Sequence, residues 1–439
     1  MKNVSELKGY TNFHHQGRTF FESFLSSLLN CNVNIQIHGI SDFENRMGID
    51  ITSNVMRNCY DWENREDEVI IVPKVMDYQT REVFAVLPIR LSGPEIHRLP
   101  RKYLDRVTRA ISRQLTQCAE QKFKSCTTSF GTEFEQFVVS YCLTPNSKEA
   151  SHLEYLISII SKLSRTTFEA NDFSTAFIYT RSAHEYSRNQ RNGKVLWLST
   201  VYDFFRTANI DKRFWYLCDG NTTAYLIDHH LKIKSMYVFG NKPGNFLDSY
   251  SLRNTLLGAD ILFRVTGSNQ VSIIDSTGIE FCYIENKWRI RNYNSIAKII
   301  EDYSGIAHTA VDSLIANIIY CAQNSISSII WVPQNSAEID DVLVSRYSAF
   351  NCTIPITEPE NMNLVRRIIS SDGVTIIDQE GQIFIHGAIV NLNKVESGGQ
   401  VGTGESAATL LSQNGVAIKI SQDGNIKVFY SNGKKKMVF

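Results

Sequence analysis

The stretch from residue 372 to residue 432 constrains the fold more than any other part of the chain. It consists of apolar segments of strand length, separated by the turn signals QEG (379–381), QDG (422–424) and SNG (431–433). Between its two halves, the glycine-rich run GGQVGTGESAATLLS leads into a short helical pattern. We therefore predict the order strand, turn, strand, loop, helix, strand, turn and strand.

The same stretch predicts a site for a phosphate group. Asp372 opens the first strand, and a loop of small residues precedes the helix; this loop contains Gly398, Gly399, Gly402, Thr403 and Gly404. Backbone N–H groups in such a loop, together with the positive end of a helix, bind phosphate oxygens. A carboxylate and a set of backbone donors are therefore expected to meet at one polyphosphate.

The length of the chain predicts several domains. A chain of 439 residues is expected to form three domains at a soft prior of about 150 residues each. The polar segment PNSKE (145–149) marks one boundary, because its proline disfavours helix. We predict a multidomain α/β and α+β protein: an N-terminal α+β domain of unknown role (1–147), a β-rich α+β middle domain (148–292), and a C-terminal mixed β-sheet flanked by helices (293–439).

The middle region is similar to the C-terminal region in the order of its elements. AYLID (224–228), a short turn and a returning strand are similar to VTIID (374–378) with its own turn and returning strand. Residues 271–283 are similar to residues 417–430 in the same way. Short β-hairpins also resemble one another without kinship. Two explanations therefore stay open: a degenerate repeat of the C-terminal domain, or chance.

Composition and charge exclude several classes of protein. The 45 Lys and Arg residues balance 45 Asp and Glu residues, so no general electrostatic case exists for binding nucleic acid or a membrane surface. The nine cysteines are odd in number and never form a C-x-x-C pair, which is typical of reduced thiols. The sequence has no apolar signal core and no apolar run of about 18 residues. We expect a cytoplasmic protein with neither nucleic acid nor membrane as partner.

Local patterns predict further elements. Helices are expected over 293–303, 311–322, 338–350 and 358–370, and strands over 214–217 and 328–332. Thr357 and Glu360 have the spacing of a capping box at the start of the last helix.

The triplet Asp228-His229-His230 closes an apolar strand and is similar to the metal-binding triplet of the DHH phosphoesterase family. That chemistry uses further aspartates upstream and a glycine-rich GGGH segment downstream, because two divalent ions need more ligands than one triplet supplies. The sequence contains neither of these segments. We therefore interpret the two histidines as part of a β-turn.

The region from about residue 295 to residue 432 resembles the diadenylate cyclase domain, the catalytic module of bacterial c-di-AMP synthases. The matching pieces occur in the order of the family: an amphipathic helix, SSIIWVP, DGVTIIDQEGQI, IFIHGAIVNL, GTGESAA and NGVAIKISQDGNIKVF. Family members typically have D-G-A at the first motif, G-T-R-H-R-A-A at the loop, and S-E near the last hairpin. The chain thus resembles a divergent member, with GTGES in place of GTRHR, and the nucleotide sensors related to that domain.

The resemblance implies roles for individual residues. The aspartate of D-G-A binds a divalent metal and helps to activate the attacking hydroxyl of ATP; its match is Asp372, followed by Gly373 and Val374. In the loop, Gly402 and Thr403 match the family. A nucleotide is accordingly expected to contact Asp372, Gly373, Val374, Gly402, Thr403, Gly404, Glu405, Ser406 and Ser421.

The chemical groups of the family motif are changed in this chain. Gly404, Glu405 and Ser406 replace the basic R-H-R triplet, and Gln422 replaces the glutamate that follows the serine matched by Ser421. Arginine stabilises the charge that develops during nucleotidyl transfer, and losing such a group typically slows a reaction by on the order of a thousandfold. These replacements favour binding over catalysis.

The sequence leaves three functional hypotheses. The first is a sensor that binds an adenine nucleotide or cyclic dinucleotide and does not cyclise ATP. The second is an active nucleotidyltransferase in which Asp372 and Glu405 are catalytic and hold Mg²⁺ or Mn²⁺ with the nucleotide. The third is a structural or interaction protein without a ligand. Because family members join two domains across one site, a homo-oligomer formed through the C-terminal domain is also expected.

Overall fold

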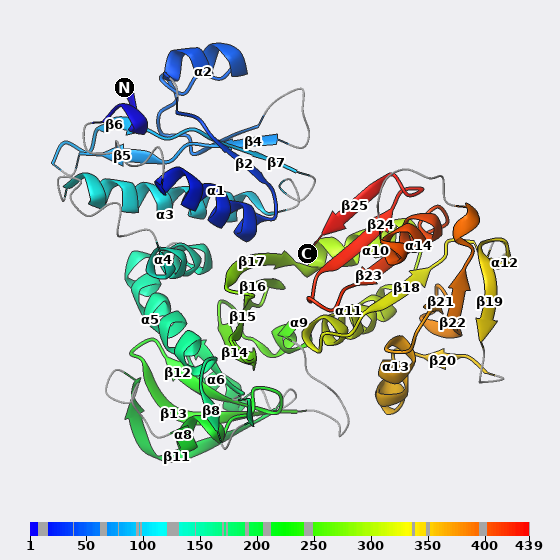
Figure 1. The fold of residues 1–439 in the computed structure, drawn as a ribbon. Helices are drawn as coiled ribbons and strands as arrows, with labels where there is room; N and C mark the ends of the chain where they lie inside the picture. Colours follow the sequence, from blue (N-terminus) through cyan, green and yellow to red (C-terminus); the bar gives the residue numbers. More distant parts are fainter. Residues whose placement is uncertain are drawn as a thin grey trace. The chain divides into compact units, whose positions relative to one another are not determined.

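The computed structural model has a mixed α/β architecture in which large mixed sheets are flanked by helices (Figure 1). It describes residues 1–7, 16–37, 39–61, 68–77, 79–93, 96, 99–120, 131–144, 146–168, 171–172, 174–188, 193–204, 212–240, 249–335, 339–347, 352–394 and 402–438. Gly398 and Gly399 of the predicted phosphate loop, and Pro145 of the predicted boundary, lie outside these residues.

The chain divides into two compact units. The first unit comprises Met1–Phe173, Ser268–Val271 and Phe281–Ile290, and the second comprises Ser174–Gly267, Ser272–Glu280 and Arg291–Phe439. The three domains expected from the sequence stay a prediction.

The first unit contains two small sheets and a set of helices. One sheet has the order β1-β6-β5 and the other β2-β7-β4-β3. The strands are β1 (Lys2–Asn3), β2 (Asn32–Ile35), β3 (Cys59–Asp61), β4 (Glu68–Ile71), β5 (Lys74–Met76), β6 (Val83–Val86) and β7 (Ile89–Ser92), with a hairpin of β8 (Thr167–Phe168) and β9 (Asn171–Asp172). The helices are α1 (Gln16–Leu29), α2 (Ile40–Met47), α3 (Arg101–Glu120), α4 (Thr132–Leu143) and α5 (Ser147–Leu163).

An eight-stranded middle sheet has the order β11-β13-β12-β10-β14-β15-β16-β17. Its strands are β10 (Thr175–Thr180), β11 (Gly193–Asp203), β12 (Thr223–Asp228), β13 (Lys232–Phe239), β14 (Ile261–Gly267), β15 (Gln270–Asp275), β16 (Ile279–Ile284) and β17 (Lys287–Asn292). The helices of this region are α6 (Ala183–Arg188), α8 (Lys212–Tyr216) and α9 (Ser249–Leu252).

The C-terminal sheet has the order β19-β22-β21-β18-β23-β24-β25, with β20 paired to β22. Its strands are β18 (Ser328–Val332), β19 (Leu343–Tyr347), β20 (Ile354–Pro355), β21 (Val374–Ile377), β22 (Gln382–Val390), β23 (Val416–Ile420), β24 (Ile426–Tyr430) and β25 (Lys435–Val438). The helices are α10 (Tyr293–Ser304), α11 (His308–Gln323), α12 (Ile339–Val342), α13 (Met362–Ile369) and α14 (Thr403–Leu411).

The central strand of the C-terminal sheet, β18, is buried on both faces, because its side chains alternate between two cores. Ile330 and Val332 pack in the core formed with α10, α11 and α13. Trp331 points to the other face, where it joins the core formed with α14. The Trp331 indole N–H also donates to the Asn414 carbonyl oxygen at 2.9 Å. The sheet is therefore the middle layer of a helix–sheet–helix sandwich.

The two large sheets have the same strand order. In the middle sheet, β10 pairs parallel to β12 and antiparallel to β14; in the C-terminal sheet, β18 pairs parallel to β21 and antiparallel to β23. Taken in chain order, the strands β10 to β15 and the strands β18, β19, β21, β22, β23 and β24 occupy the same places. A duplicated folding unit would produce this match, and duplication stays a prediction.

The turn after the second strand of each parallel pair is also the same. Asp228 Oδ1 accepts hydrogen bonds from the N–H groups two and four residues later, and so does Asp378 Oδ1. The residue three positions after each aspartate, Leu231 or Gly381, has a positive φ. The predicted β-turn at Asp228-His229-His230 is thus present. If the sheets are aligned on these turns and on their strand order, β14–β15 matches β23–β24. The predicted similarity of residues 271–283 to residues 417–430 pairs β15–β16 with β23–β24, so it is shifted by one strand from this alignment.

Three local predictions are wrong. Residues 214–217 were expected as a strand but belong largely to α8, because Trp215 packs against Phe204 and Tyr225 and this contact outweighs aromatic strand propensity. The helix expected over 338–350 is reduced to the single turn of α12, and β19 follows it and pairs with β22. At the start of the helix expected over 358–370, the cap is Glu358 without a side-chain hydrogen bond, so Thr357 does not cap it.

Within the described part of the chain, no helix is both long enough and apolar enough to cross a membrane.

Gly415 is predicted to be essential for the second unit. Its φ is +102°, and a Cβ there would lie 2.2 Å from the Val332 carbonyl oxygen. Gly305 is a matched control, because its φ is +70° and a Cβ there would meet nothing within 4 Å. Gly415→Ala should lower the free energy of unfolding by about 3 kcal/mol or more, whereas Gly305→Ala should lower it by about 1 kcal/mol. Urea unfolding measures both, and equal losses would contradict the close backbone approach.

Candidate functional site

A groove of about 1110 Å³ lies at one edge of the C-terminal sheet. It is formed where β18 and β21 begin, where β22 and β23 end, and where α14 starts. Of the residues predicted to contact a nucleotide, Asp372, Gly373, Val374, Thr403 and Gly404 line this groove. Four others, Gly402, Glu405, Ser406 and Ser421, are not among its lining residues.

The Asp372 carboxylate lies at the groove and accepts one hydrogen bond from a neighbouring backbone N–H group. Asp372 is exposed, and its Oδ1 accepts a hydrogen bond from the Gly373 N–H at 2.9 Å. The next residue must be glycine, since the φ of Gly373 is +90° and a Cβ would lie 2.6 Å from the Gly387 carbonyl carbon on β22. The close approach of these two strands therefore fixes the position of the carboxylate.

The first turn of α14 faces the same groove. Its N-cap is Gly402, which supplies no side-chain cap. The N–H groups of Glu405 and Ser406 both donate to the Gly402 carbonyl oxygen, at 2.9 and 3.1 Å. Thr403 and Gly404 form the lining. The positive end of the helix dipole is thus directed at the groove, which suits an anion; the one acidic side chain of this first turn, Glu405, is paired with Lys427 and Lys436.

Lys419 supplies a positive charge that the sequence motif lacks. Its ammonium donates to Ser327 Oγ at 2.6 Å and to the Ile420 carbonyl oxygen at 2.9 Å. An ammonium has three N–H donors, so one is left for a ligand. Burial of the side chain is the main cause that lowers the pKa of Lys419, and Lys427 adds to it. An anion in the groove would therefore stabilise the charged form.

Gly404 makes room for this lysine. A Cβ at Gly404 would lie 2.9 Å from Lys419 Cε and 3.7 Å from its Nζ. Gly404 is the position at which the resembling family has the first arginine of its basic triplet. The chain thus places a lysine from β23 beside the site where the family motif would place an arginine on α14.

The opposite part of the groove is apolar and aromatic. Tyr347 on β19 is 63% exposed, and Ile389 on β22 is 57% exposed. The Tyr347 ring meets the His386 ring edge to face, with centroids 5.3 Å apart. Exposed apolar side chains gathered in one groove indicate a ligand-binding surface.

Glu405 does not join Asp372 in the groove, because its carboxylate is paired with two lysines. Lys427 donates to its Oε1, and Lys436 lies 3.5 Å from its Oε2. The hydrogen bond from Lys427 is the main cause that lowers the pKa of Glu405. Ser421 belongs to a turn, where its N–H donates to the Asn425 carbonyl oxygen at 3.0 Å. Both residues thus have roles within the fold.

The middle sheet has an arginine at the position that corresponds to Lys419. Phe177 on β10 lies between Tyr225 and Phe263, as Ile330 on β18 lies between Thr375 and Ile418. The residue after Phe263 is Arg264, and the residue after Ile418 is Lys419.

Arg264 is enclosed, whereas Lys419 lines a groove. Arg264 is 3% exposed, and its guanidinium donates to Ser249 Oγ at 3.0 Å and to Asn221 Oδ1 at 2.6 Å. Asn221 precedes β12 as Ser371 precedes β21, and Ser249 begins the helix before β14 as Thr403 begins the helix before β23. The middle sheet therefore fills with its own side chains the space that the C-terminal sheet leaves open.

Comparison with known proteins assigns no family. No protein-family model matches the chain, and no curated protein matches it either. Among the described residues, no group of three or more His, Cys, Asp or Glu side chains is arranged to hold a metal ion. A metal at the groove would have Asp372 as its protein carboxylate and would need oxygens from a bound nucleotide.

Sequence reasoning missed Lys419 and Tyr347. The sequence does single out Lys419, since a lysine within the otherwise apolar strand VAIKI is unusual unless its ammonium reaches a polar partner or solvent. The sequence gives no sign of the position of Tyr347, because its segment has a helical pattern and only the pairing of β19 with β22 brings the side chain to the groove.

Glu405→Gln is predicted to destabilise the fold in a pH-dependent way. Because the pKa of Glu405 is lowered from its ordinary 4.5, its stabilising effect is complete above about pH 4.5 and disappears as pH falls through the folded-state value. The variant should unfold about 1 kcal/mol more easily at pH 7, and this difference should shrink as the pH falls below about 4.5.

Urea unfolding across this pH range measures the difference. Glu360→Gln is the control, since Glu360 is exposed and its substitution should change little at any pH. A Glu405→Gln protein as stable as the parent at pH 7 would show that the two lysine contacts contribute nothing.

Proposed function

We propose that the groove of the C-terminal sheet binds an adenine nucleotide or a cyclic dinucleotide, and that the protein acts as a nucleotide sensor. The observation that carries this proposal is the arrangement of the groove. A lysine ammonium and an uncapped helix start lie at one end, and exposed aromatic and apolar side chains lie at the other.

The polar end suits a phosphate group. Lys419 offers an N–H donor, and the first turn of α14 offers the positive end of a helix. Hydrogen bonds to charged groups contribute about 1.5–3 kcal/mol each, more than neutral ones. Gly404 allows the backbone to approach a phosphate closely, because it carries no Cβ.

The apolar end suits a base. Tyr347, Ile389 and Leu392 are exposed and line the groove. Stacking a base on an aromatic side chain contributes about 1–3 kcal/mol. A ligand with both a planar apolar ring and a phosphate matches the two ends together, and nucleotides have this composition.

Binding is favoured over cyclisation by the charges at the site. The basic triplet of the resembling family is absent, and Lys419 provides one point charge where arginine would provide a two-pronged donor. Glu405 is held by Lys427 and Lys436. Its use as a metal ligand would require these pairs to break and would leave both ammonium groups without their carboxylate.

An active nucleotidyltransferase is the second candidate, and it is favoured by Asp372. The exposed carboxylate lines the groove and is free to contact Mg²⁺ or Mn²⁺ carried by a nucleotide. If this candidate is right, incubation of the protein with ATP and either metal yields a cyclic or linear dinucleotide, and Asp372→Asn abolishes it. Chromatograms without product under both metals would eliminate it.

Calorimetric titration with ATP and with c-di-AMP tests the proposed function. At least one of them should bind, and Lys419→Met should weaken that binding by about ten- to a hundredfold, the equivalent of one lost charged hydrogen bond. Lys298→Met is the matched control, because Lys298 is an exposed lysine on α10 and its loss should leave the affinity unchanged.

Two results would contradict the proposal. One is the absence of binding to either ligand by a protein whose circular dichroism shows that it is folded. The other is binding that Lys419→Met and Lys298→Met leave equally strong, because the ligand would then not occupy the groove.

A further inference from the structure

A second cavity lies in the first unit, beside the edge strand β5. Its volume is about 640 Å³, which is in the range of small-molecule sites. Strand β5 is the last strand of its sheet, and α3 packs along its open edge. The lining residues are Met56, Asn58, Lys74, Met76, Asp77, Arg81, Val83, Arg109, Ser112, Arg113 and Thr116.

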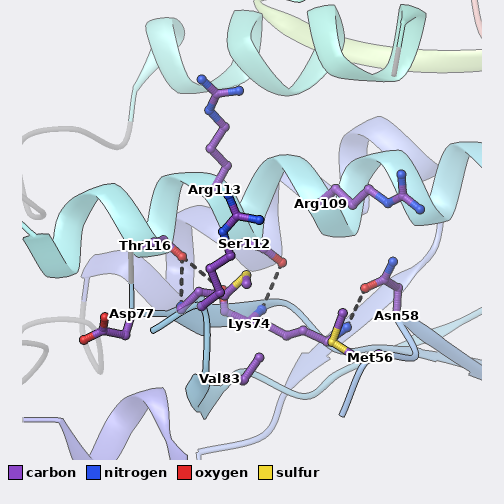
Figure 2. A pocket seen from close by; sticks show the side chains of 11 residues that line it. Met56, Asn58, Lys74, Asp77, Val83, Arg109, Ser112, Arg113 and Thr116 are labelled. Atoms are coloured by element: carbon purple, nitrogen blue, oxygen red, sulfur yellow. Dashed lines mark hydrogen bonds between the residues drawn. The ribbon is translucent and has the colours of Figure 1, made fainter. Parts of the chain in front are cut away.

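Two hydroxyls of α3 hold the strand at the cavity. Ser112 Oγ accepts from the Lys74 N–H at 2.9 Å, and Thr116 Oγ1 accepts from the Met76 N–H at 3.1 Å. These bonds replace the missing neighbour of the edge strand. Figure 2 shows how the side chains lie: Lys74 extends below α3 toward Asn58, while Arg109 projects from the helix. The cavity thus lies between strand β5 and helix α3.

The lining carries a surplus of positive charge. It contains four basic side chains, Lys74, Arg81, Arg109 and Arg113, and one acidic side chain, Asp77, which leaves a surplus of three. The Asp77 carboxylate is already used, because its Oδ1 accepts from the N–H groups of Gln79 and Thr80. Arg113 is directed to Tyr141. Among the described residues, the guanidinium groups of Arg81 and Arg109 form no hydrogen bond and no ion pair.

The burial of Lys74 distinguishes this cavity from an ordinary basic surface. The residue is only 6% exposed, and its ammonium donates to Asn58 Oδ1 at 2.7 Å. Within the described residues, it forms no ion pair with a carboxylate. The pKa of Lys74 is lowered to about 8: burial is the main cause and Arg109 contributes, while Cys59 and Asp105 act in the opposite direction. The charge of Asp105 reaches this ammonium only without direct contact, so a buried ammonium whose one hydrogen-bond partner is a neutral amide still favours an anion beside it.

We propose that this cavity binds a small phosphorylated molecule, with the phosphate between Lys74 and Arg109. A surplus of three positive charges matches a ligand with at least two negative charges, and the guanidinium of Arg109 forms paired hydrogen bonds with phosphate. Met56, Met76 and Val83 form an apolar wall for the organic part of the ligand. The site is independent of the groove in the second unit, since all its lining residues belong to the first.

Titration of the full chain with inorganic pyrophosphate at low ionic strength tests this proposal. Pyrophosphate should bind at a single site of the first unit, and Arg109→Gln and Lys74→Met should each weaken it at least tenfold. Lys102→Gln, which removes an exposed charge from the same helix, should change the affinity less than twofold. Lys419→Met weakens the second-unit groove, so Arg109→Gln and Lys74→Met are also made in this variant, where the pyrophosphate binding that they remove belongs to the first unit.

A labelling experiment gives a readout that does not depend on affinity. An amine-reactive reagent at pH 8 should modify Lys74, and pyrophosphate should protect it while leaving Lys102 reactive. No binding, equal affinity in Arg109→Gln and Lys102→Gln, or absence of protection at Lys74 would overturn the proposal. Tighter binding of citrate than of pyrophosphate would overturn the assignment of phosphate.

Discussion

The pairing of β18 with β21 on one side and β23 on the other determines the C-terminal sheet. Ile330, for example, lies opposite Thr375 in the parallel pair and opposite Ile418 in the antiparallel pair. Because β18 is buried on both faces, a shift by one residue would exchange Trp331 with its neighbours between two different cores. This constraint fixes the register of three strands, and with it the end of each strand that contributes to the groove.

The chemical character of the groove is a consequence of that register. The start of β21 positions Asp372, the end of β23 positions Lys419, and α14 enters between them because its apolar face packs on Trp331 and Phe429. The middle sheet has the same strand order, yet Arg264 is enclosed by Ser249 and Asn221. One architecture thus carries an open site in one sheet and a closed one in the other, and the difference lies in a few polar side chains.

Sequence reasoning predicted several C-terminal elements because their patterns are local. Strand 328–332 and the turns at 379–381 and 422–424 depend on alternation and turn residues, which can be read from neighbouring positions. The Asp372 carboxylate and the glycine-rich loop were predicted to meet at one polyphosphate, and Asp372 and Thr403 both line the groove. Gly404 and Glu405 were recognised as changed, but their partners were not.

The remaining features depend on contacts between distant residues. Lys419 reaches Ser327 across 92 positions of sequence, and β19 becomes a strand only because β22 is there to pair with it. Lys74 and Arg109 likewise meet because α3 packs on an edge strand. Periodicity and propensity contain no information about contacts between residues distant in the sequence. A single sequence therefore predicts the helices and strands of these sites better than the side chains that line them.

A crystal structure of the protein with bound ATP is the most direct test of the central claim, that the edge of the C-terminal sheet is a nucleotide site. The account predicts a phosphate within hydrogen-bonding distance of Lys419 Nζ and the first turn of α14, and the adenine beside Tyr347 and Ile389. ATP bound elsewhere in the second unit, with this groove occupied only by solvent, would contradict it.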